Sequence, residues 1–164
     1  MGHFSEQKNH LFLVEVFSHV LKKNPKAKLV LIGEGAGRQS VEKKCYELGI
    51  EKAVIFLGVR NDVNRILNSF DVFCFPSRYE GLPVSLIEAQ SIGIPCVYAD
   101  TITKEVNILN KQNVVLSLNE AFDRWSDAII SIKNRYEDPQ RVLRESGYDI
   151  KIEAQKIADY YLSS

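Results

Sequence analysis

Short apolar runs alternate with amphipathic stretches along most of the chain. Apolar runs of strand length occur at 28–32, 53–57, 71–76, 96–99 and 114–118. Apolar residues recur at helical spacing in seven stretches, which predicts seven helices. These stretches are 9–23, one that ends at Gly49, 62–69, 83–92, 119–134, 138–145 and 149–162. Strands that alternate with helices predict an α/β fold, a doubly wound, Rossmann-like parallel sheet with helices on both faces.

Two parts of this pattern are less regular. Thr101 or Thr103 could cap a further helix that runs through Leu109. A doubly wound sheet of six strands has its first strand in the middle, whereas residues 1–4 hold only the end of one. We therefore expect a truncated first strand and a sheet that is strained, gapped or filled by a partner near residues 1–4.

The composition is that of one ordinary globular domain over residues 1–164. Hydrophobic residues make up 45% and charged residues 26%, and the formal net charge is zero, so nothing favours a nucleic-acid surface. The chain holds no apolar run near the roughly 20 residues that span a bilayer. Cys45, Cys74 and Cys96 lack metal-ligand spacing and predict free thiols in a reducing, cytoplasmic compartment.

Residues 80–88 carry the most informative chemistry. Pro83 suits the first helical position, and Gly93 followed by Pro95 suits the end of that helix. The free N–H groups of a helix start favour anions, above all phosphate. Glu88 would lie about 8 Å from the helix start, at about 1.5 Å per residue. This span predicts a nucleotide-sugar site, with Glu80 facing the sugar, the helix start the diphosphate and Glu88 the ribose.

Other interpretations of these residues remain. Two carboxylates nine positions apart are common, and each could be an ordinary solvated side chain. The glycines at positions 33, 35 and 37 are similar to a dinucleotide fingerprint, but they lack its spacing and do not follow an opening strand. A nicotinamide-dependent oxidoreductase is therefore disfavoured. A non-catalytic interaction domain with the same strands stays open.

The chain resembles the donor-binding half of family 4 retaining glycosyltransferases, which have the GT-B fold. The resemblance rests on Glu80 and Glu88 with seven residues between them, on 2–8, and on the strand ends 31–35 and 54–58. It covers nearly the whole chain. The segments 5–10 and 100–105 look most like the capsular and exopolysaccharide enzymes of that family.

The resemblance implies roles for individual residues. Lys8 matches a phosphate-binding lysine and Glu80 an acid that holds sugar hydroxyls, which makes these two the catalytic candidates. His3 stands where the family usually has an arginine, and its imidazole offers a phosphate fewer hydrogen-bond donors than a guanidinium group does. The other substrate-binding candidates act through backbone groups or line the loops around the donor: Gly35, Val59, Arg60, Gly81, Leu82, Val84, Ser85 and, on the ribose, Glu88.

The resemblance also implies a reaction. A sugar would pass from a nucleotide diphosphate, expected to be UDP, to a glycan or lipid-linked acceptor with retention of configuration, without a metal or other cofactor. The acceptor would bind to an N-terminal domain that is absent here, so the isolated chain is expected to be inactive. The full enzyme would be cytoplasmic or at the inner face of the membrane. Half of a nucleotide-sugar epimerase is the related alternative.

Overall fold

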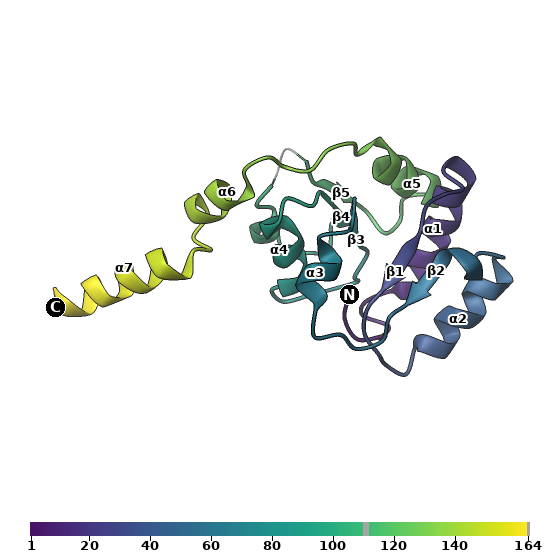
Figure 1. The fold of residues 1–164 in the computed structure, drawn as a ribbon, viewed down its shortest axis with the longest axis horizontal. Coiled ribbons are helices and arrows are strands. Elements are labelled where there is room, and N and C mark those ends of the chain that lie inside the picture. Colours follow the sequence, from purple (N-terminus) through teal and green to yellow (C-terminus); the bar gives the residue numbers. More distant parts are fainter. Residues whose placement is uncertain (110–111, 164) are drawn as a thin grey trace.

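The computed structural model describes residues 1–109 and 112–163 and confirms the predicted parallel α/β organisation (Figure 1). Each predicted apolar run contains one short strand: β1 Leu29–Leu31, β2 Val54–Phe56, β3 Phe73–Phe75, β4 Cys96–Ala99 and β5 Val114–Leu116. The helices are α1 His10–Lys23, α2 Arg38–Glu47, α3 Val63–Leu67, α4 Val84–Ser91, α5 Phe122–Ser131, α6 Pro139–Glu145 and α7 Ile150–Leu162. Two single 3-10 turns, η1 Glu51–Ala53 and η2 Lys104–Val106, complete the elements.

The strands form two separate parallel sheets. β1 pairs with β2, so that Leu29 lies opposite Val54. The second sheet has the order β3-β4-β5, and Phe73 lies opposite Cys96. Among the described residues no strand pairing joins β1 to β3, and the sheet is therefore gapped at the place the sequence predicted.

Each sheet has its own apolar cluster. All four side chains of β4 are buried, as expected for a central strand covered on both faces, and they pack with Trp125 of α5. The second cluster joins α1 to β1 and includes Leu13, Val14 and Leu31. Because these two clusters meet at α1 and α5, which pack against each other, the helices hold the two sheets together.

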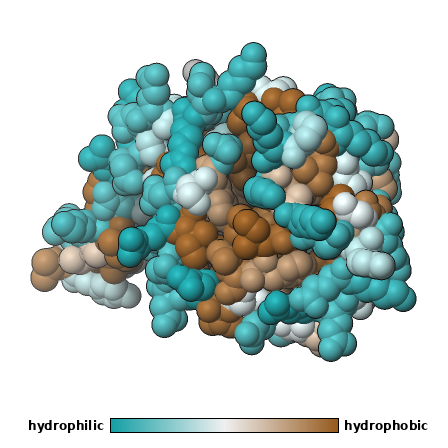
Figure 2. Space-filling view, turned by 45° about the vertical axis from the view of Figure 1, so that its right-hand side comes forward, coloured by the Kyte–Doolittle hydropathy of each residue, from teal (hydrophilic) through white to brown (hydrophobic). Residues whose placement is uncertain are grey.

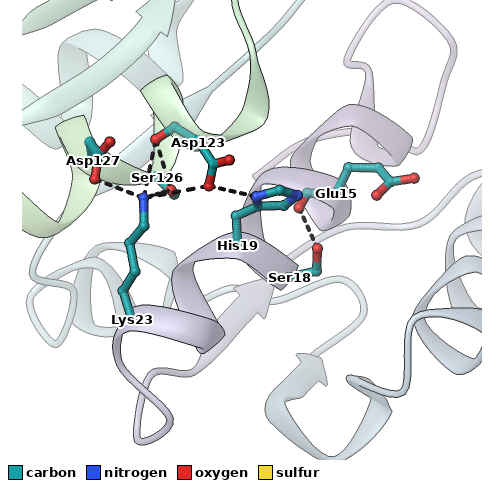
Figure 3. A network of polar contacts seen from close by, with 7 residues as sticks. All are labelled: Glu15, Ser18, His19, Lys23, Asp123, Ser126 and Asp127. Atoms are coloured by element: carbon teal, nitrogen blue, oxygen red, sulfur yellow. Dashed lines mark hydrogen bonds and ion pairs between the residues drawn. The ribbon is translucent and has the colours of Figure 1, made fainter.

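A polar network on the surface also fixes α1 against α5 (Figure 3). Lys23 Nζ donates to Ser126 Oγ and to Asp127 Oδ1, both at 2.7 Å. His19 Nδ1 lies 2.8 Å from Asp123 Oδ1, and this contact lowers the pKa of the Asp123 carboxyl below its usual value. Since the network orients α1, it also orients the turn at residues 5–9 that leads into this helix.

Several predicted elements are shorter in the structure. The helix expected to run to Leu109 is wrong: only the turn η2 forms, and Gln90 accepts hydrogen bonds from the N–H groups of Ile108 and Leu109 instead.

Asp138 and Asp149 cap α6 and α7 with their side chains. No residue of α7 is buried, and α6 and α7 extend away from the sheets (Figure 1). Over the described ranges, no helix has the length and apolar character that a bilayer crossing requires.

Candidate functional site

The two residues predicted to be catalytic lie side by side. Lys8 is in the turn before α1, and Glu80 is in the loop between β3 and α4. Lys8 Nζ lies 2.8 Å from Glu80 Oε1, and only 20% and 10% of the two side chains are exposed. The ammonium group also lies 4.9 Å from the centre of the Phe75 ring. Burial and an aromatic face therefore surround a close pair of opposite charges.

The contact between Lys8 and Glu80 is an ion pair rather than an aligned hydrogen bond. Glu80 Oε1 is buried and has no hydrogen-bond partner among the described residues. A buried carboxylate oxygen is costly without a donor, because it has lost its water. The oxygen is thus available to accept a hydrogen bond from a bound molecule.

Two hydrogen bonds hold the two loops together. Gln7 Nε2 donates to the Tyr79 carbonyl at 3.0 Å, and the Arg78 N–H donates to the Gln7 carbonyl at 2.8 Å. These bonds fix the turn that carries Lys8 to the loop that carries Glu80. The sequence did not predict a role for Gln7, because nothing near a single amide side chain in a polar turn indicates which distant residue it will contact.

The loop after β1 brings His3 and Gly35 together. A Cβ atom on Gly35 would lie 2.6 Å from Phe4 N and 2.9 Å from His3 Cε1, and the φ of Gly35 is 151°. Only glycine permits this approach. Gly33 donates its N–H to the Gly58 carbonyl at 2.8 Å and lies against Gly2, on which the Lys8 stem packs. The carboxyl ends of β1, β2 and β3 thus converge on one place, as is typical of ligand sites in such sheets.

Val59 and Arg60 follow Gly58 at the rim of this place. Val59 is 68% exposed. The Arg60 Nε and Nη2 groups each donate to Asp62 at 2.8 Å, and this pairing lowers the pKa of Asp62 below its usual value. The bidentate contact uses the edge of the guanidinium and leaves its flat faces open for stacking.

The start of α4 is open to solvent. Pro83 is the residue before the helix and not its first residue as predicted, because its ψ of 88° is not helical. Its carbonyl accepts from the N–H groups of Leu86 and Ile87. Pro83 offers no side-chain cap, and within the described part of the chain no side chain caps the N–H groups of Val84 and Ser85. These two groups and the helix dipole favour a bound anion.

The remaining candidates lie around this helix start. Gly81 and Leu82 are exposed in the loop before it, and a Cβ on Gly81 would meet no atom within 4 Å. Glu88 lies one turn further along α4, is partly exposed and makes no ion pair with any other described side chain. The structure therefore brings Lys8 to Glu80 and His3 to Gly35. Among the described residues, no hydrogen bond or ion pair joins Glu88, Val59 or Arg60 to these four.

Asn9 and His10 belong to the same region, and the sequence did not single them out as site residues. Asn9 has a φ of 54° and is the one non-glycine residue with a positive φ within 1–109 and 112–163. Asparagine tolerates this left-handed conformation better than most residues do. An asparagine directly before a predicted helix was therefore the sequence signal that could have indicated a special backbone conformation here. The His10 ring is buried and stacks on Phe4 with centroids 4.3 Å apart. Burial, and then the positive charges of the amino terminus and Lys8, lowers the pKa of His10 to about 4.

The chain is similar in sequence to one protein family and to known glycosyltransferases. Residues 1–149 match the family described as "Glycosyl transferases group 1". The chain is 33% identical over 168 aligned residues to EpsF of Bacillus subtilis (strain 168), covering 98% of this chain and 44% of EpsF. It is 28% identical to the UDP-Gal:alpha-D-GlcNAc-diphosphoundecaprenol alpha-1,3-galactosyltransferase of Escherichia coli, covering 99% of this chain and 44% of that enzyme. The chain thus spans less than half the length of these relatives.

A solved structure supports the fold. Anabaena Alr3699/HepE in complex with UDP and glucose superimposes with a TM-score of 0.78 over 99% of this chain and 48% of that protein, at 18% identity. At this identity the similarity concerns the fold alone, and it agrees with the parallel sheets and flanking helices described above. On the extent of the family match and the identity to EpsF, the chain belongs to the glycosyl transferases group 1 family.

Proposed function

We propose that the chain binds the nucleotide-sugar donor of a retaining glycosyltransferase, and that the donor is a UDP-sugar. Family membership supports sugar transfer. The E. coli relative is named for UDP-Gal, and HepE was solved with UDP and glucose, which favours uridine over other bases. In the proposed reaction the sugar passes to a glycan or lipid-linked acceptor with retention at the anomeric carbon.

The observation that carries the proposal is the geometry around Glu80. Its Oε1 is a buried acceptor without a hydrogen-bond donor, and a cation lies 2.8 Å away. A molecule that satisfies both residues must present hydroxyl groups next to negative charge. A sugar joined to a diphosphate has this combination, whereas a neutral sugar has only the hydroxyl groups.

In this proposal each candidate acts on one part of the donor. Lys8 and the uncapped N–H groups of Val84 and Ser85 contact the diphosphate and stabilise the charge that develops on it as the sugar leaves. Glu80 holds the sugar hydroxyls in the reactive orientation. Glu88 accepts from the ribose hydroxyls.

The remaining candidates complete the pocket. The backbone at Val59 and the guanidinium face of Arg60 take the base. His3 and Gly35 lie at the diphosphate end, next to the Lys8 turn. Gly81 keeps the approach to the helix start open, because it has no side chain and the space around it is empty, and the exposed Leu82 lies next to it in this loop.

The proposal includes partners outside this chain. The acceptor would bind a second, N-terminal domain of a longer enzyme, and the present chain alone would bind donor without transferring sugar. The name of the E. coli relative contains an undecaprenol-linked acceptor, which favours a lipid-linked acceptor and a cytoplasmic enzyme working at the inner face of the membrane. Polysaccharide biosynthesis is the process we propose.

Titration calorimetry on the 164-residue chain tests donor binding. UDP should bind more tightly than GDP or ADP, and Lys8→Met should weaken UDP binding about 10- to 150-fold, since a charge-assisted hydrogen bond contributes about 1.5–3 kcal/mol. Lys44→Met is the matched control, because Lys44 pairs with Glu15 of α1 and not with a site residue, so its loss should leave binding unchanged. Absence of binding to all three nucleotides would refute the proposal and favour a non-catalytic interaction domain.

A further inference from the structure

The backbone that carries Glu80 is held by the turn before α1. The Arg78 N–H donates to the Gln7 carbonyl at 2.8 Å, and Gln7 Nε2 donates to the Tyr79 carbonyl at 3.0 Å. Both bonds end on residues that come directly before Glu80. Because Gln7 also comes directly before Lys8, these two bonds place both members of the ion pair and do not direct Glu80 alone.

Thr101 holds the same loop from the end of β4. Its Oγ1 donates to the Ser77 carbonyl at 2.9 Å, in a partly buried contact. This hydroxyl therefore caps no helix, which the sequence had allowed, because its proton goes to a loop far away in the chain. Ser77 is only 1% exposed, so its carbonyl would lose its partner without gaining water if the Thr101 hydroxyl were removed.

The turn that carries Thr101 is itself fixed by the sheet that contains β4. The Asp100 N–H donates to the Leu116 carbonyl at 2.9 Å, and the Ile102 N–H donates to the Ala99 carbonyl at 3.1 Å. The Ile102 side chain is buried in the apolar cluster around β4. A residue that is held on both sides in this way can serve as a fixed point for a neighbouring loop.

Beyond Tyr79 the backbone of the loop has no such support. Within the described residues, no hydrogen bond involves a backbone group of 80–82. Hydrophobic contact can also hold a loop, and hydrophobic residues gather near the middle of the face drawn in Figure 2. Such contact is non-directional, and the loop residue Leu82 is itself 55% exposed. The hydrogen bonds at 77–79 are therefore what sets the direction of Glu80.

We propose that Thr101 is a positioning residue for Glu80, and that its hydroxyl makes the site prefer a nucleotide-sugar over the free nucleotide. The proposal rests on the donor-binding function above, in which Glu80 holds the sugar hydroxyls and Lys8 contacts the diphosphate. The Thr101 hydroxyl holds the Glu80 loop, whereas Gln7 holds that loop and adjoins Lys8. Loss of the Thr101 hydroxyl should therefore weaken sugar binding and spare diphosphate binding, whereas loss of the Gln7 amide should weaken both.

Titration calorimetry with UDP, UDP-glucose and UDP-galactose on the 164-residue chain tests the proposal. Thr101→Val removes the hydroxyl and keeps the shape of the side chain, and Thr101→Ser keeps the hydroxyl. Thr103→Val is the matched control, because it makes the same change later in the same loop, where the hydroxyl makes no hydrogen bond to any described residue.

Thr101→Val should weaken the tighter-binding nucleotide-sugar about 3- to 10-fold, the loss expected for one hydrogen bond, without weakening UDP. Thr101→Ser and Thr103→Val should both keep the preference of the wild type for a nucleotide-sugar over UDP. Gln7→Met should weaken the binding of UDP and of the nucleotide-sugar together.

A second measurement needs no ligand. Urea unfolding of the wild type, Lys8→Met, Glu80→Gln and the double variant gives the coupling free energy between the two site residues. Repeated in the Thr101→Val background, the cycle should give a coupling that is smaller by about half or more, because Glu80 is then less well directed at Lys8. Repeated in the Thr103→Val background, it should give the coupling of the wild type.

Equal weakening of UDP and of the nucleotide-sugar by Thr101→Val would overturn the proposal, because the threonine would then serve only the fold of the loop. An unchanged nucleotide-sugar affinity, an unchanged coupling, or the same effects from Thr103→Val would overturn it too. If the wild type binds none of the three ligands, the donor-binding function fails, and the unfolding cycle still decides whether Thr101 positions Glu80.

Discussion

Glu80→Gln should tighten UDP binding although it removes a site residue. In the free site the Glu80 carboxylate holds Lys8 at 2.8 Å, and both are largely buried. A diphosphate that takes Lys8 must break this ion pair and come close to the carboxylate. Glutamine keeps the size of the side chain and removes the competing charge, so Lys8 becomes free for the diphosphate.

The magnitude follows from the contact. The pair is close but partly exposed and is not an aligned hydrogen bond, so we assign it about 1–2 kcal/mol, above the median of exposed pairs. Removing that competition should lower the Kd for UDP about 5- to 30-fold. The same change should weaken the binding of the sugar, because the glutamine amide accepts hydrogen bonds from sugar hydroxyls less strongly than the carboxylate does. UDP-glucose should therefore lose its advantage over UDP in the same variant.

Titration calorimetry with UDP on the wild type, Glu80→Gln, Lys8→Met and the double variant forms a complete cycle. In the Lys8→Met background the Glu80→Gln change should have a much smaller effect on UDP affinity. Glu15→Gln is the control, since it breaks an ion pair with Lys44 away from the site. Weaker UDP binding by Glu80→Gln would refute the reasoning, because the carboxylate would then orient Lys8 instead of competing for it.

Three further predictions concern the surroundings of the site. His10 has a folded pKa of about 4 against an ordinary 6.5, so the unfolded chain gains its proton first as the pH falls. Between pH 7 and pH 4.5 this residue should lower the free energy of unfolding by about 2–3 kcal/mol. Urea unfolding of His10→Phe should show a pH dependence that is smaller by this amount. Asn9→Gly should fold as stably as the wild type, whereas Asn9→Val should cost about 1–3 kcal/mol in the left-handed conformation; equal urea midpoints would contradict this. Gly35→Ala should lose about 1–3 kcal/mol and weaken UDP binding severalfold, because its Cβ would displace Phe4 and His3; unchanged calorimetry would contradict it.

The sequence alone determined the element order and the fold class. Apolar runs and helical periodicity reflect local burial, so they predicted the five strands and the helices α1 to α7 of the described residues. They set the ends less well: the strands are three or four residues long because pairing, and not hydrophobicity, ends them. The extra helix to Leu109 failed because a distant side chain, Gln90, takes up the backbone groups that a helix would have used.

The sequence also named Lys8, Glu80, His3 and Gly35 as site residues, but the tertiary structure decided how they meet. The distance from Lys8 to Glu80 depends on two loops joined through Gln7. Such a contact between residues far apart in the chain leaves no periodicity to detect. The gap between β1 and β3 was predictable from a strand count, whereas the hydrogen bonds that the Gly2 and Phe4 N–H groups donate to the Ile32 and Glu34 carbonyls required coordinates. The sequence gives the residue types and their local spacing, whereas tertiary packing alone decides which distant groups pair.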